Sequence, residues 1–73
     1  MDLNLAFGLA VRSARNQLGL SQERLADMAG LDRTYISGLE RGTRNPTLTS
    51  QRRIAEALGR PLSELIRDAE ERE

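Results

Sequence analysis

The sequence predicts an all-α protein with a single domain, residues 1–73, made of five short helices. Apolar residues recur at spacings of three and four, which is the period of one face of a helix. Glycines and prolines divide the 73 residues into five such segments, and no segment alternates apolar and polar residues as a strand would. A chain of this length forms one small core, because it buries only about 60–65% of its unfolded surface.

The first predicted helix covers residues 3–18. Gly19 ends it, because glycine can take the left-handed conformation that stops a helix, and Leu20 then folds back. Gly8 lies inside this helix at a cost of about 1 kcal/mol relative to alanine, so we expect close packing there. The apolar face of the helix consists of Leu3, Phe7, Ala10, Val11, Ala14 and Leu18.

Residues 21–29 and 32–41 form the next two predicted helices. Ser21 and Asp32 are residue types that cap helix N-termini, and Gly30 ends the first of the two. Only a short turn joins these helices, so we expect them to cross at a large angle, which is the helix-turn-helix arrangement.

The last two predicted helices cover residues 48–58 and 62–69. Thr47 caps the first of them, and Pro61 opens the second, which carries an apolar stripe. We expect the acidic C-terminal tail, about residues 68–73, to be frayed.

The composition argues against an enzyme. The chain has no cysteine and no histidine, so thiol nucleophiles, disulfides and the commonest general base and metal ligand are missing. No apolar run approaches the length of a membrane span, and the first residues do not resemble a signal peptide, so we expect a cytoplasmic protein. We therefore expect a binding module with no catalytic residue, no metal and no cofactor.

The net charge of zero hides an asymmetry along the chain. Residues 31–60 contain six arginines and three acidic residues, whereas residues 61–73 contain two arginines and five acidic residues. One positive face can thus coexist with a neutral total, and that face matters more than the total for a polyanionic partner.

The outward face of the predicted helix at residues 32–41 is unlike an ordinary solvated face. It holds weak helix formers where solvated faces usually carry strong ones. Its glycine lowers helix stability, which suggests that something large approaches the backbone. The DNA major groove admits a helix, and arginine and threonine recognise base edges there. This face and its flanks consist of Arg33, Thr34, Tyr35, Ser37, Gly38 and Arg41.

Other side chains fit the same interpretation. Arg44 and Asn45 follow the helix in a loop and are expected to contact phosphates, although the same residues also suit an ordinary turn. Gln22 opens its helix, where it either donates to a phosphate or is a plain helix-start residue. Arg15 and Glu40 are expected to form an ion pair between helices, because phosphates would repel the carboxylate.

The segment LGLSQERLADMAGLDRTYISGLERGTRNPTLTSQRRIAEALGRPLSEL resembles the Cro/C1-type helix-turn-helix family, also called the XRE family. Within it, RTYISGLERGTRNPT is most similar to the controller proteins of bacterial restriction–modification systems. The resemblance implies a lambda-repressor-like fold and a homodimer that binds double-stranded DNA at pseudo-palindromic operators. It also implies transcription regulation that times restriction endonuclease expression, with RNA polymerase as a further candidate partner.

The resemblance also assigns residues. Its dimer surface corresponds to Leu62, Leu65 and Ile66, whose alternative is packing against the first helix. The chain departs from the family at Gln51, where an apolar residue is usual. Its DNA contacts correspond to Gln22, Arg33, Thr34, Tyr35, Ser37, Arg41, Arg44 and Asn45.

Other functions remain open from the sequence. A phage-type repressor or an antitoxin of the same family has the same pattern, and gene neighbourhood would separate them. A protein-interaction module of this fold that does not bind DNA is a further alternative. Arg52 and Arg53 contact phosphate or simply face water.

Overall fold

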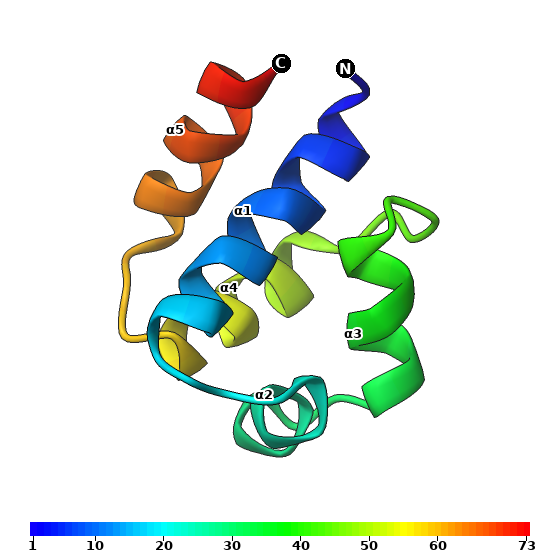
Figure 1. The fold of residues 1–73 in the computed structure, drawn as a ribbon, viewed down its shortest axis with the longest axis vertical. Coiled ribbons are helices and arrows are strands. Elements are labelled where there is room, and N and C mark those ends of the chain that lie inside the picture. Colours follow the sequence, from blue (N-terminus) through cyan, green and yellow to red (C-terminus); the bar gives the residue numbers. More distant parts are fainter.

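The computed structural model describes all 73 residues and contains five α-helices, with no strand. In Figure 1, α1 and α5 run side by side in opposite directions, so that the two chain ends lie together. The N-terminal ammonium donates to the carbonyl of Glu73 at 3.4 Å. The all-α, five-helix prediction is confirmed. The helices are α1 (Leu3–Gln17), α2 (Gln22–Ala29), α3 (Arg33–Glu40), α4 (Leu48–Ala57) and α5 (Leu62–Arg72).

The helices begin and end where local sequence signals place them. Ser21, Asp32 and Thr47 each accept a hydrogen bond from a backbone N–H in the first turn of α2, α3 and α4. Gly30 and Gly42 follow α2 and α3 with φ values of +68° and +79°, which side-chain-bearing residues rarely adopt. These signals act within a few residues, so they can be read without knowledge of the fold.

Two details of the sequence prediction were wrong. Helix α5 continues to Arg72 instead of ending at residue 69, and Arg72 Nε donates to Asp68 Oδ1 at 2.8 Å across one turn. Leu3 and Leu18, which were predicted to belong to the apolar face of the first helix, are 48% and 53% exposed.

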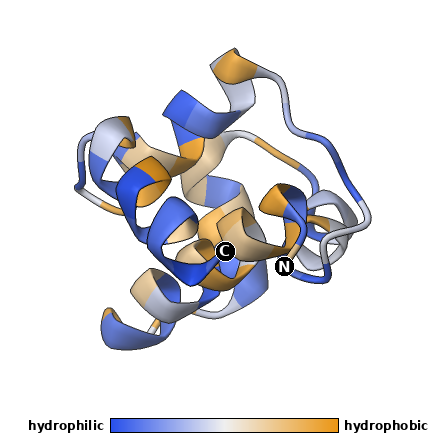
Figure 2. Cartoon of the chain, turned by 90° about the horizontal axis from the view of Figure 1, so that it is seen from above, coloured by the Kyte–Doolittle hydropathy of each residue, from blue (hydrophilic) through white to orange (hydrophobic).

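The core lies between the helices and contains fifteen buried apolar residues from all five of them. Figure 2 shows apolar segments at the centre, where the helices meet, and hydrophilic segments mostly outside. Close packing at Gly8 is confirmed: a Cβ there would lie 2.1 Å from the carbonyl oxygen of Leu39. The backbone of α1 therefore rests directly on the C-terminal end of α3.

No helix of the structure has both the length and the apolar character needed to cross a membrane. No group of three or more histidine, cysteine or acidic side chains is arranged to hold a metal ion.

Candidate nucleic-acid interface

Helices α2 and α3 form a helix-turn-helix. Leu31 N–H donates to Ala26 O at 2.9 Å, and Gly30 N–H donates to Asp27 O at 3.2 Å, which ends α2 at a left-handed glycine. In Figure 1, α2 is seen almost along its axis while α3 lies across the view, so the two helices cross at a large angle. The crossing leaves one side of α3 uncovered.

The uncovered side of α3 is polar. Ile36 and Leu39 are fully buried, whereas Arg33, Thr34 and Arg41 are exposed. This is the face that helical spacing predicts, because residues three and four apart share one side of a helix.

Thr34 is fixed by the cap of its own helix. Its N–H and its hydroxyl both donate to Asp32 Oδ1, at 2.9 and 2.8 Å. These bonds, with a smaller contribution from the charge of Arg44, hold the pKa of Asp32 below its ordinary value. Thr34 therefore keeps its methyl group and an acceptor site on its hydroxyl oxygen for a ligand.

The interpretation of Gly38 as an opening for a large partner was wrong. Gly38 is buried, and its carbonyl accepts from the N–H and the hydroxyl of Thr43, at 2.9 and 3.0 Å. A Cβ at this position would lie 3.0 Å from Arg44 Cγ. The backbone at Gly38 is thus approached by the protein's own loop, which folds back against α3.

Two exposed arginines are held beside α3. Arg41 Nη1 donates to the Ser37 hydroxyl one turn earlier. The guanidinium of Arg44 lies 5.6 Å from the ring centroid of Tyr35, a cation–π contact worth about 0.5–1 kcal/mol at an exposed site. Tyr35 itself is half-buried against the core. The structure therefore brings Arg41 and Arg44 together with the exposed face of α3, and Asn45 is exposed next to Arg44.

A buried network joins α1, α2 and α3. Arg15 Nε and Nη2 donate to the two carboxylate oxygens of Glu40, at 2.8 and 3.0 Å, which confirms the predicted ion pair. The hydrogen bond to Glu40 raises the pKa of Arg15. Gln22 Nε2 also donates to Glu40, at 3.0 Å. The sequence pattern does not predict this bond, which leaves one amide N–H of Gln22 for another acceptor.

The predicted dimer surface on α5 needs one correction. Leu65 has no exposed surface, because it faces inward in the core of the single chain. It is therefore not available to a partner. Leu62 and Ile66 are only half-buried and border a shallow hollow on the outside of α5.

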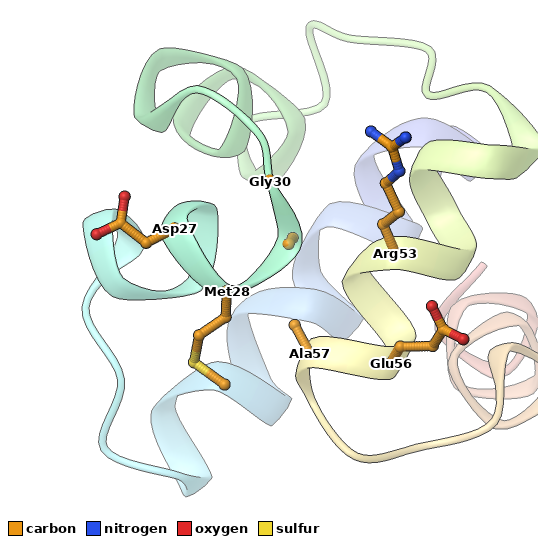
Figure 3. A pocket seen from close by; sticks show the side chains of 7 residues that line it. Asp27, Met28, Gly30, Arg53, Glu56 and Ala57 are labelled. Carbon is orange, nitrogen blue, oxygen red and sulfur yellow. The ribbon is translucent and has the colours of Figure 1, made fainter.

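The arginines of α4 lie among carboxylates. Arg52 pairs with Glu56 across one turn, with 3.7 Å between Nε and Oε2. Arg53 lines an open hollow between the end of α2 and α4 (Figure 3), which Asp27 and Glu56 also line. Met28, which is exposed, also lines it. This region has a mixed charge and does not extend the positive face of α3.

Two residues that were not predicted as functional anchor the loop after α3. Thr43 binds the backbone of α3, as described above, and Gln51 Nε2 donates to Pro46 O at 3.1 Å. Gln51 could have been recognised from the sequence, because it is a polar residue on the face of α4 that otherwise points toward the core. Nothing in the sequence pattern singles out Thr43.

Comparisons with known proteins agree with this geometry. The helix-turn-helix family HTH_3 matches residues 11–65. The chain is 44% identical over 66 residues to the control protein C.SmaI of Serratia marcescens, covering 90% of this chain and 79% of that protein. It is 48% identical over 59 residues to C.BamHI of Bacillus amyloliquefaciens, covering 80% and 73%. The crystal structure of the restriction-modification controller protein C.AhdI from Aeromonas hydrophila is similar, with a TM-score of 0.82, 46% identity and coverage of 84% and 92%.

Proposed function

We propose that this chain, which belongs to the helix-turn-helix family HTH_3, is the controller protein of a restriction–modification system. Members of this family are DNA-binding regulators and not enzymes. In this proposal a homodimer binds an operator of two inverted half-sites and times expression of the endonuclease. The identities of 44–48% to C.SmaI and C.BamHI, both named control proteins, support this role over that of another regulator of the family.

The exposed polar face of α3 with its loop is the observation that carries the proposal. Arg33, Arg41 and Arg44 are exposed on it. The one carboxylate of α3 itself, Glu40, points inward and is neutralised by Arg15. The exposed cap residue Asp32 adds one negative charge, so the three arginines still leave the face positive in a chain of zero net charge, which suits the phosphates of a duplex.

We assign base recognition to α3 and phosphate contact to its surroundings. One row along the helix consists of Arg33, Ser37 and Arg41, which follow one another at intervals of four residues. Arginine in the major groove pairs best with guanine. We assign phosphate contact to Arg44 and Asn45, because both are exposed in the loop that follows this helix.

Three further side chains complete the assignment. Thr34 offers its methyl group to a thymine, because its hydroxyl proton is committed to Asp32. Tyr35 supports Arg44, whose guanidinium lies over its ring, and we assign its phenol to a DNA contact at the edge of the face. The remaining N–H of Gln22 reaches a phosphate at the start of α2, where the helix dipole favours an anion.

We infer a homodimer from the small reach of one helix. One recognition helix reads only a few base pairs, and two copies read two half-sites roughly 34 Å apart, which is one turn of duplex. We place the contact between copies at Leu62 and Ile66, the apolar residues of α5 that the fold leaves partly exposed. RNA polymerase remains the candidate partner for activation at the bound promoter.

Selection of bound sequences from a random duplex pool tests the proposal. We expect two inverted half-sites about one helical turn apart, and a matching sequence upstream of restriction–modification genes. Recovery of such an operator beside prophage or toxin genes would instead support a phage-type repressor or an antitoxin. A pool that stays random, with binding lost at moderate salt, would favour a protein-interaction module.

A further inference from the structure

Gln51 is a polar side chain on the core-facing line of α4. Ile54 and Leu58 on that line are buried, whereas Gln51 is half-buried. A partly buried amide destabilises a fold unless its donors find partners. Gln51 Nε2 finds one in the carbonyl of Pro46, at 3.1 Å.

That bond holds one end of the loop between α3 and α4. At the other end, Thr43 binds the carbonyl of Gly38 through two donors, at 2.9 and 3.0 Å. Arg44 and Asn45 are exposed and lie between these two anchors. The segment proposed to contact phosphate is thus attached at one end to the recognition helix and at the other end to α4.

The core itself does not need an amide at this position. Gln51 lines a small hollow of about 110 Å³ that Phe7 and Ile66 also line. An apolar side chain of similar bulk at position 51 would line the same hollow and bury apolar surface in place of the amide, which is favourable. What an apolar side chain cannot do is donate to Pro46, so the amide serves the loop.

We propose that Gln51 is a positioning residue for DNA binding, whose amide fixes Arg44 and Asn45 where they meet a phosphate. This inference rests on the proposed function, because it requires a loop that contacts DNA. A loop ordered before binding loses less entropy in the complex, so the anchor improves affinity without touching DNA.

The test uses the full chain, its selected operator and the variants Gln51→Met and Gln51→Leu, which keep side-chain bulk but cannot donate. Fluorescence anisotropy gives the affinity between about 50 and 200 mM salt. We expect binding about fivefold weaker and a salt slope shallower by up to about 0.9, the value of one phosphate contact. The melting temperature should stay unchanged or rise. Gln17→Met, a glutamine on α1 bonded to Arg60, is the matched control and should not alter binding.

A second comparison separates positioning from a general effect. In an Arg44→Ala/Asn45→Ala background, Gln51→Met should change affinity less than twofold, because both groups that it positions are gone. Equal losses with and without these two side chains, or unchanged affinity and slope in the single variants, would overturn the inference. Unfolding of both Gln51 variants would also overturn it, since the amide would then serve the fold. Failure of the wild-type chain to bind any duplex would refute the proposed function instead.

Discussion

Gly8 and Gly38, the two glycines inside helices, are expected to differ in how substitution by alanine changes the stability of the protein. A Cβ at Gly8 would lie 2.1 Å from Leu39 O and 2.9 Å from Glu40 Cα, both backbone atoms. Real Cβ atoms do not approach so closely, so α1 must move away from α3. Overpacking of this kind costs about 3 kcal/mol at the upper end of its range. The higher helix propensity of alanine stabilises the helix by about 1 kcal/mol relative to glycine and offsets part of this cost. We expect Gly8→Ala to lower the free energy of unfolding by about 2 kcal/mol.

Gly38→Ala is the matched control. Its Cβ would meet side-chain atoms, Arg44 Cγ at 3.0 Å and Thr43 Oγ1 at 3.2 Å. These atoms can shift by a few tenths of an ångström, and the gain in propensity of about 1 kcal/mol offsets the strain. We expect little change in stability. We also expect weaker DNA binding, because the shift displaces the loop that carries Arg44.

Thermal unfolding followed by circular dichroism checks both variants. A loss of about 2 kcal/mol should lower the melting temperature of Gly8→Ala by about 8–16 °C in a domain of this size. Gly38→Ala should melt within a few degrees of the wild type. Equal melting temperatures for the wild type and Gly8→Ala would refute the packing argument. A Gly38→Ala protein that binds its operator with unchanged affinity would refute the proposed link between this glycine and the loop.

Four further predictions follow from the site and the core. Arg41→Ala should weaken operator binding by about 1–3 kcal/mol and relax one base position per half-site in a repeated selection; equal weakening on every sequence would make Arg41 a phosphate contact. Glu40→Gln leaves the buried Arg15 without a counter-charge, so the free energy of unfolding measured in urea should fall by about 3 kcal/mol. A fall of less than about 1 kcal/mol would contradict the structural role of this ion pair. Asp32 has a lowered pKa in the folded protein. Its contribution to stability is therefore complete above its unfolded pKa, near 4, and is lost as the pH falls further. Asp32→Asn should flatten the pH dependence of the melting temperature below about pH 4, and an unchanged pH dependence in this range would contradict the role of Asp32. Leu65→Glu should prevent folding, because Leu65 lies in the core. Ile66→Glu should give a folded protein that sediments as a monomer. A dimeric Ile66→Glu protein would exclude this part of α5 as the interface.

Local sequence determined the helices and the direction that each one faces. The caps at Ser21, Asp32 and Thr47 are bonds to backbone groups two or three residues away. Such bonds depend on residue type and spacing alone. The outward face of α3 was predictable for the same reason, because helical periodicity separates Ile36 from Thr34 before any packing is known. The DNA contacts assigned to that face remain a prediction.

Only the tertiary structure determined which polar and apolar groups remain exposed and which are covered or hydrogen-bonded within the chain. Gly38 and Leu65 both looked available in the sequence, and both are covered by segments of the same chain. Gln22 and Gln51 acquire their partners across 18 and 5 residues respectively, from side-chain and backbone atoms on other elements. Residue type and periodicity place a side chain on a face of its own helix, but only the packing of the whole chain determines what lies opposite that face.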